Sequence, residues 1–242
     1  MKNKNTEDPS VFFDSNVNFY SNLSSSQYQD KYHKYFLDFI ENRKEDYSSL
    51  LDVGGGNGVF AKSVLNQFPN VKVTIVDPSE EALKLIDDNR IDRVNGKLPY
   101  QMPLLPKFTY IHIKEVFHHI TGASVKSSCK LLMDSLYTIK KYQANDGVVF
   151  IHEVYYESFV IPSFSRTLIF YLLKLQNKIK IKIPIKEFML SLDVCFYTRK
   201  EFKSMLLDAG FKIIDERDYE VKNIKNKLIL LKNYGAMLFI LK

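Results

Sequence analysis

Four glycines within five residues are the feature that most constrains how this chain of 242 residues can fold. The apolar segment 49–53 leads directly into Gly54-Gly55-Gly56-Asn57-Gly58, and the residues that follow have helical spacing. Glycines let the backbone turn sharply and let a ligand approach it within contact distance. A strand, a glycine loop and a helix in this order are typical of nucleotide-binding α/β folds.

From residue 49 onward, strand-like and helix-like segments alternate, which predicts a mostly parallel sheet. We therefore expect an α/β fold: a seven-stranded, mostly parallel, doubly wound sheet with an antiparallel last strand, helices on both faces and a helical insertion after strand five. The strands are expected at residues 49–53, 71–76, 91–94, 108–113, 147–154, 211–214 and 236–241. A cap at Thr198 and a stop at Gly210 delimit the last predicted helix.

Two segments lie outside this alternation. Residues 1–47 are predicted to form an N-terminal tail and helical cap, with a frayed polar stretch at 1–16 and a helix at about 29–42. Residues 48–242 form the main domain, and its segment 156–197 is too long and too apolar for a simple loop. This insertion can be a lid over the substrate, an interfacial or dimer contact, or a helix buried against the sheet.

The spacing of the glycines excludes two common nucleotide sites. The dinucleotide fingerprint needs a third glycine where Val59 stands, and no Gly-Lys-Ser/Thr of a P-loop follows. Instead, Asp52 lies two positions before Gly54, and a second acidic residue, Asp77, ends the second predicted strand. The loop thus has an acidic residue before it and another at the next strand.

Residues 50–58 and 74–77 resemble the first two motifs of the class I S-adenosylmethionine-dependent methyltransferases. In that family an apolar-apolar-Asp-apolar stretch precedes Gly-x-Gly-x-Gly, and an acidic residue ends the second strand. The resemblance implies a Rossmann-like fold and S-adenosyl-L-methionine as cofactor. It covers roughly residues 48–155 and 196–242 and is uninformative about the substrate.

The family pattern also implies roles for individual residues. Asp52 is expected to help hold the methionine end of the cofactor, through its ammonium or an intervening water. Asp77 is expected to accept hydrogen bonds from both ribose hydroxyls. The glycines expected to leave room for the cofactor are Gly54, Gly56 and Gly58.

Two further stretches extend or qualify the resemblance. Residues 111–120 resemble the end of the family's fourth strand, and Glu115 in them is expected to contact the cofactor. Many members carry an acidic residue for the adenine soon after the third strand, where this chain has Asn95 and Lys97. The adenine is therefore left to the Asn95 side chain or to backbone groups.

Polar residues after strands four and five are the candidates for catalysis, because ligands lie beyond the carboxyl ends of parallel strands. A histidine titrates near neutral pH and can act as a general base. We predict this role for His119, as the family-like position, or for His118; the alternative is that the two only pack or lie exposed. Glu153 is either catalytic or part of a structural ion pair, because an unpaired buried carboxylate is costly. His33 and His112 are expected to be surface or packing residues.

Composition limits the class of protein. Apolar residues make up 45% of the chain, no apolar run reaches the roughly 18 residues of a membrane span, and the N-terminus lacks a signal-peptide core. Cys129 and Cys195 fit neither a disulfide framework nor a metal site. We expect a soluble cytoplasmic protein without a metal site or transmembrane segment, with a possible homodimer formed through the insertion.

The charge leaves the acceptor open. Residues 101–242 carry 22 Lys and Arg against 13 Asp and Glu, either as a solvated surface or to attract an acidic partner. The motifs of DNA-methylating branches are missing, so DNA is not expected as a partner. The first hypothesis is methyl transfer to oxygen, nitrogen or carbon of a small, apolar or acidic molecule. The alternatives are RNA or protein as acceptor, or a non-catalytic binding protein.

Overall fold

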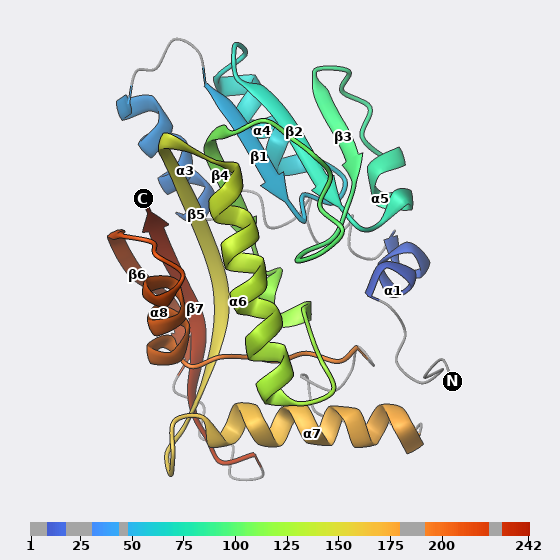
Figure 1. Cartoon of the computed structure of the whole chain (residues 1–242), viewed down its shortest axis with the longest axis vertical. Coiled ribbons are helices and arrows are strands. Elements are labelled where there is room, and N and C mark those ends of the chain that lie inside the picture. Colours follow the sequence, from blue (N-terminus) through green and yellow to red (C-terminus); the bar gives the residue numbers. More distant parts are fainter. Residues whose placement is uncertain (1–8, 18–30, 44–47, 180–191, 223–228) are drawn as a thin grey trace. The chain divides into compact units, whose positions relative to one another are not determined.

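The computed structural model describes residues 9–17, 31–43, 48–179, 192–222 and 229–242 (Figure 1). Residues 180–191 of the predicted insertion lie outside these ranges. The strands are β1 (Ser49–Val53), β2 (Lys72–Asp77), β3 (Ile91–Asn95), β4 (Phe108–Lys114), β5 (Gln143–Ser158), β6 (Ile213–Lys222) and β7 (Leu231–Leu241). The helices of these ranges are α1 (Pro9–Ser15), α3 (Lys31–Arg43), α4 (Val59–Gln67), α5 (Glu80–Lys84), η1 (Phe117–His119), α6 (Val125–Tyr142), α7 (Phe164–Ile179) and α8 (Arg199–Asp208).

The strands form one seven-stranded sheet in the order β3-β2-β1-β4-β5-β7-β6. β1 pairs in parallel with β2 and with β4, and β2 pairs in parallel with β3, whereas β6 and β7 are antiparallel. The predicted fold class is therefore confirmed, including the number of strands and the helix inserted after strand five. No helix in the described ranges is long and apolar enough to cross a membrane.

The chain divides into two compact units, and we describe each by itself. The glycine-loop unit comprises Ser10–Lys114 and Lys141–Phe150, with the last residue of the chain. The histidine unit comprises Glu115–Lys140 and the described residues of Ile151–Leu241.

An aromatic cluster fills the core of the glycine-loop unit beside α3. Phe36 of α3 is fully buried, and its ring meets those of Phe60 and Phe150 edge-on, with centroids 5.1 and 4.5 Å away. Such edge-to-face pairs add to the burial of apolar area. The helix predicted at about 29–42 is thus confirmed as α3 from Lys31 onward, whereas residues 29 and 30 lie outside the described ranges.

The N-terminal stretch that we expected to be frayed contains a helix, so that prediction was wrong for α1. Phe12 of this helix is buried, at 8% exposure. Its Asp14 carboxylate accepts hydrogen bonds from the Ser79 hydroxyl at 2.6 Å and from the Glu81 backbone N–H at 3.2 Å. The buried ring of Phe12 and the hydrogen bonds between Asp14 and the start of α5 therefore hold α1 in place.

Helix caps in both units follow the local sequence. In the glycine-loop unit, Ser79 caps α5 by accepting from the Ala82 N–H at 3.1 Å. In the histidine unit, Thr198 and Glu201 form a reciprocal capping box at the start of α8. The predicted cap at Thr198 is confirmed.

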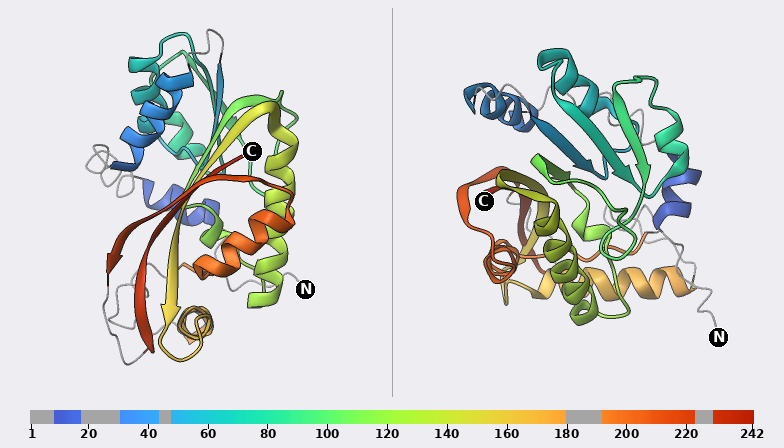
Figure 2. Two further views of the ribbon diagram at one scale, coloured as in Figure 1. Left: turned by 90° about the vertical axis from the view of Figure 1, so that its left-hand side faces the viewer. Right: turned by 45° about the horizontal axis from the view of Figure 1, so that its top comes forward.

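The antiparallel pair of the histidine unit is longer than predicted. We expected strands at 211–214 and 236–241, whereas β6 and β7 span ten and eleven residues. Figure 2 shows these two strands side by side, in orange-red and dark red. β6 is polar over most of its length and pairs only with β7, with irregularities between Ile213 and Asp215 and between Tyr219 and Lys222. A polar edge strand lacks the apolar alternation that sequence patterns detect.

Within the insertion, α7 has two apolar faces. One face is buried and places Ile169 and Leu173 in a cluster with Tyr156 and Phe196. The opposite face carries apolar side chains that are between 42% and 52% exposed, namely those of Phe164, Tyr171, Leu175 and Ile179. The helix is therefore buried on one side, as one of the three interpretations requires, and presents an apolar stripe on the other.

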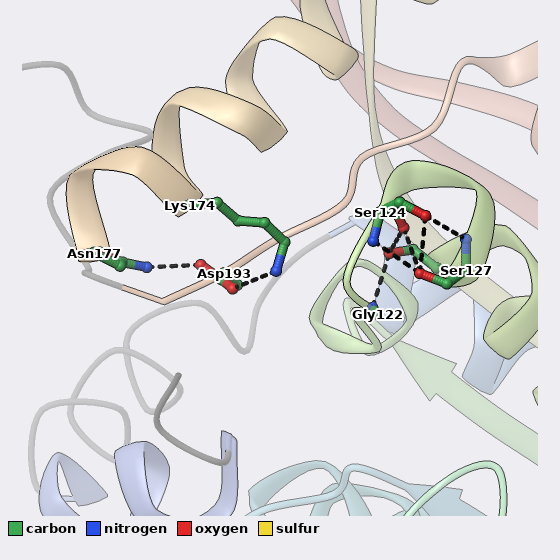
Figure 3. Close-up of polar contacts among 7 residues, drawn as sticks. Gly122, Ser124, Ser127, Lys174, Asn177 and Asp193 are labelled. Atoms are coloured by element: carbon green, nitrogen blue, oxygen red, sulfur yellow. Dashed lines mark hydrogen bonds and ion pairs between the residues drawn. The ribbon is translucent and has the colours of Figure 1, made fainter. Parts of the chain in front are cut away.

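Polar contacts fix the ends of helices in the same unit, as Figure 3 shows. Asp193 accepts from Lys174 Nζ at 3.0 Å and from Asn177 Nδ2 at 2.7 Å, both on α7. Before α6, the Ser124 N–H donates to the Ser127 hydroxyl at 2.8 Å, and the Ser127 N–H donates back to the Ser124 hydroxyl at 3.1 Å. These contacts anchor the C-terminal half of α7 and the first turn of α6.

Candidate functional site

The glycine loop has a backbone that few other residues can adopt. Gly54, Gly56 and Gly58 have φ angles of 74°, 54° and 74°, all in the left-handed region. The Gly54 N–H donates to the Val76 carbonyl at 2.7 Å, which joins the loop to the end of β2. A Cβ at Gly56 would meet no atom of the described residues within 4 Å, so among these residues its backbone faces open space. Three glycine positions predicted from the motif are thus required by the turn itself.

Gly55 is a fourth constrained position, which the motif treats as variable. Its φ is ordinary, but a Cβ there would lie 2.5 Å from Asp52 Oδ2. The constraint is therefore steric, because the carboxylate of the preceding strand occupies the place of a side chain. Only a neighbour in space reveals this, so sequence spacing did not single out Gly55.

Asp52 is buried and paired with a histidine. The residues Asp52 of β1 and His112 of β4 are register partners on adjacent parallel strands. His112 Nδ1 lies 2.7 Å from Asp52 Oδ1, and both side chains are no more than 3% exposed. Asp52 Oδ2 is also buried, and no hydrogen-bond partner for it occurs in the described ranges. The expected packing role of His112 thus includes a polar contact that we did not predict.

Asp77 lies at the end of β2 and accepts two backbone hydrogen bonds. The Gly56 N–H donates to Oδ2 at 2.9 Å, and the Ser79 N–H donates to Oδ1 at 2.8 Å. Burial raises the pKa of Asp77 to about 6, although these two hydrogen bonds oppose the shift. Each carboxylate oxygen keeps a further lone pair, so the group can still accept hydrogen bonds from a ligand.

Asn95, expected near the adenine, lies at the end of β3. Its Nδ2 donates to the backbone carbonyl of Pro78 at 3.1 Å and, at 3.3 Å, to that of Asp77. The side chain thus supports the turn that follows Asp77. Its predicted contact with the adenine stays a prediction.

The histidine unit contains a second buried carboxylate–histidine pair. His118 Nδ1 lies 2.6 Å from Glu153 Oε1, and the glutamate is fully buried. The backbone N–H groups of Phe117 and Val154 donate to Glu153 at 2.8 Å each, and that of His118 donates at 3.3 Å. Glu153 is thus paired, as its burial requires, and both of its oxygens are saturated.

The two neighbouring histidines differ in their affinity for a proton. Although burial works against the charged ring, Glu153 raises the pKa of His118 above its ordinary value. Burial, followed by repulsion from His118, lowers the pKa of His119 well below that value. The rings are 4.0 Å apart between centroids. His118 is therefore the stronger base of the two.

Glu115 follows β4 with a backbone that is unusual for a residue with a side chain. Its φ is 55°, its N–H donates to the His152 carbonyl at 2.7 Å, and its carboxylate lies 3.6 Å from His152 Nδ1. Such backbone strain often marks functional sites. The side chain is 44% exposed, so the carboxylate is accessible for the predicted contact with the cofactor.

A family model described as a methyltransferase domain matches residues 25–216. The cephaeline 6′-O-methyltransferase of Carapichea ipecacuanha is 38% identical over 74 residues, which are 31% of this chain and 20% of that protein. The isoflavone 7-O-methyltransferase of Glycyrrhiza echinata is 23% identical over 195 residues, which are 78% of this chain and 46% of that protein. The chain therefore spans between a fifth and about half of the length of these relatives.

Solved structures show the same fold. A TehB-like S-adenosylmethionine-dependent methyltransferase from Corynebacterium glutamicum has a TM-score of 0.58 at 11% identity and covers 94% of this chain and 98% of its own. A family 2 O-methyltransferase from Planctomyces limnophilus, in complex with apigenin, has a TM-score of 0.52 at 16% identity. It covers 81% of this chain and 49% of its own.

Proposed function

Because the chain belongs to the methyltransferase domain family, we propose that it transfers a methyl group from S-adenosyl-L-methionine to a small-molecule acceptor. The single observation that carries this proposal is the glycine loop between two buried carboxylates, those of Asp52 and Asp77. Among oxygen, nitrogen and carbon acceptors, the relatives that are O-methyltransferases favour a hydroxyl oxygen. An apolar or acidic acceptor is the class we expect.

The residues of the glycine-loop unit fit this cofactor. Asp52 Oδ2 is a buried oxygen without a partner among the described residues, and a ligand ammonium would satisfy it. The open space at Gly56 allows the close approach of a ligand to the loop. Asp77 would accept from the ribose hydroxyls through its remaining lone pairs. Glu115 is a further proposed contact, on the basis of its exposed carboxylate and left-handed backbone.

We assign the role of general base to His118, with Glu153 as its positioning residue. When bound, the cofactor supplies the electrophilic methyl group on a sulfonium. Glu153 holds Nδ1 of the ring, so Nε2 is the nitrogen that takes the proton from the acceptor hydroxyl. The carboxylate then stabilises the resulting imidazolium. His119 is proposed as a neutral neighbour in contact with the acceptor rather than as the base.

Calorimetry with S-adenosylmethionine and with NAD tests the class of cofactor. We expect S-adenosylmethionine to bind and NAD not to bind. Binding of NAD without binding of S-adenosylmethionine would contradict the proposal. Transfer of a radiolabelled methyl group to extracted metabolites, and separately to RNA and protein fractions, then tests the acceptor. Label in a macromolecular fraction would favour the alternative acceptor, which the basic balance of residues 101–242 supports. Cofactor binding without any transfer would favour a non-catalytic binding protein.

The exposed stripe on α7 supports a homodimer, which we propose as the oligomeric state. The apolar side chains of the stripe follow one another at spacings of seven, four and four residues, so they lie on one face of the helix that a second copy can cover. Light scattering should find a dimer that Leu175→Ser weakens. Leu207→Ser on α8 is the matched control, because Leu207 is 50% exposed, close to the 52% of Leu175. A monomer in the unmodified protein would refute the proposal.

We also propose a cytoplasmic location. Both cysteines of the chain, Cys129 and Cys195, are free, as expected of a reducing compartment. Fractionation of the source cells, with detection of the native protein, tests this location. Recovery from a membrane or secreted fraction would contradict it.

A further inference from the structure

The buried pair of Asp52 and His112 can do more than pack. His112 lies on β4, one strand away from β1 and the glycine loop, and its hydrogen bond to Asp52 links it to the loop. Its Nδ1 bonds Oδ1 of the carboxylate, while the other oxygen, Oδ2, lies against Gly55. The histidine therefore holds one oxygen and leaves the other directed at the loop.

The ring of His112 is fixed from several sides. It stacks on Phe60 with centroids 3.8 Å apart and an angle of 21° between the planes. Phe36 meets it edge-on at 5.4 Å, and Tyr32 lies at 5.6 Å. The second nitrogen, Nε2, is buried, and no hydrogen-bond partner for it was found within the described residues. Within the described part of the chain, the ring thus forms one hydrogen bond, to Asp52.

A carboxylate with one bonded and one free oxygen is costly to bury. If His112 were only a packing residue, an apolar ring would fill the same space without the need to satisfy a polar atom. The arrangement has a use if Oδ2 is satisfied by a ligand group. A ligand ammonium that approaches along the glycine loop would meet an oxygen whose orientation is already set, which lowers the entropic cost of binding.

We propose that His112 is a positioning residue that orients Asp52 toward the ammonium of the cofactor. This proposal rests on the proposed function, since it assumes S-adenosylmethionine as the ligand. It makes a distinction within that ligand, because His112 should influence the binding of the amino acid end and not that of the adenosine end.

Two ligands separate these ends. S-Adenosylmethionine carries the ammonium, whereas 5′-methylthioadenosine keeps the adenosine and lacks the amino acid. Measured by calorimetry, His112→Leu should raise the Kd for S-adenosylmethionine about tenfold, as expected for a disturbed bond to a charged group. The Kd for 5′-methylthioadenosine should stay within about twofold, because that ligand does not reach Asp52.

Conservative variants separate positioning from packing. His112→Asn keeps a donor nitrogen close to the place of Nδ1 and should restore most of the affinity, whereas His112→Gln displaces the amide by one methylene and should not. This pair keeps the proposal testable if His112→Leu does not fold. His33→Leu is the matched control, since His33 is buried at 4% exposure and stacks on the same Phe60 ring at 4.9 Å. It should leave the ratio of the two Kd values unchanged.

Three results would overturn the inference while the proposed function stands. They are an unchanged Kd for S-adenosylmethionine in a folded His112 variant, an equal loss for both ligands, and an equal loss in His112→Asn and His112→Gln. If the unmodified protein binds neither ligand, the proposed function itself fails, and the inference with it.

Discussion

The two units each contain a buried carboxylate bonded to Nδ1 of a histidine, at 2.7 Å for Asp52 and at 2.6 Å for Glu153. The two pairs differ in whether the carboxylate keeps an oxygen without a hydrogen-bond partner. Glu153 is saturated by backbone N–H groups, whereas Asp52 keeps one oxygen without a partner in the described structure. In our proposal, Glu153 holds the His118 imidazole in place, and the imidazole takes the proton. For the other pair we propose the reverse: His112 holds the carboxylate of Asp52, and the carboxylate binds the ligand.

Removal of the His118 imidazole, the proposed general base, should have the largest effect. His118→Ala should lower the rate of methyl transfer by about 10²- to 10⁴-fold, the usual contribution of a general base, and leave the affinity for S-adenosylmethionine unchanged. Single-turnover transfer together with calorimetry measures both quantities. His119→Asn is the companion variant. If His119→Asn loses the activity while His118→Ala retains it, the base is His119 and not His118.

Removal of the Glu153 carboxylate should have a smaller effect on the rate of methyl transfer and should change the pH dependence of that rate. Glu153→Gln removes the negative charge that raises the pKa of His118, so the acidic limb of the rate profile should move to lower pH, with a loss of about tenfold or more at its plateau. A profile that does not move would show that His118 is not the titrating base.

The same pair should make stability depend on pH. Because the pKa of His118 is raised in the folded state, the pair stabilises the protein below the unfolded pKa of about 6.5, and this contribution is lost as pH rises through the folded pKa. The difference in unfolding free energy between the unmodified protein and Glu153→Gln should therefore shrink from pH 5 to pH 8. Denaturant titrations at several pH values measure it.

Asp77 offers a test in the glycine-loop unit. Asp77→Ala should weaken the binding of S-adenosylmethionine by about 1.5–3 kcal/mol, as expected for lost hydrogen bonds to a charged group. Its pKa of about 6 also predicts that binding weakens in acid, by about tenfold at pH 5, because the protonated carboxyl is a poorer acceptor. Calorimetry between pH 5 and pH 8 checks both. An unchanged affinity in the variant would exclude Asp77 as the ribose ligand.

Gly55→Ala should produce the smallest change in cofactor affinity, and it tests the role of Asp52. The added Cβ would lie 2.5 Å from Asp52 Oδ2, so the carboxylate must shift at a cost of about 1–3 kcal/mol in stability. The midpoint temperature of thermal unfolding and the affinity for the cofactor should both decline. Equal effects on the Kd values for S-adenosylmethionine and 5′-methylthioadenosine would mean that the whole loop moved and not the carboxylate alone.

The parts of the site that sequence predicts are those made by neighbours along the chain. The turn at Gly54 to Gly58 requires glycines at fixed spacing, and Asp77 ends a short apolar strand, so both were visible in the pattern. The fold class followed from the alternation of strands and helices for the same reason.

The parts that were missed depend on residues that are distant in sequence. His112 is 60 positions from Asp52, and Glu153 is 35 positions from His118. These pairs arise from strand register and from the path of the chain after β4, which no local pattern encodes. The steric need for glycine at position 55 also comes from a side chain, and the length of β6 comes from its pairing with β7.

Glu201 serves two helices with one carboxylate. Its oxygens accept from the Thr198 N–H at 3.0 Å, which caps α8, and from the guanidinium of Arg166 on α7. A substitution at either position would therefore disturb both helices, whereas the exposed stripe of α7 is free of this constraint. Among natural variants of this chain, we expect Arg166 and Glu201 to change together or not at all, while the stripe diversifies with the partner or substrate that it meets.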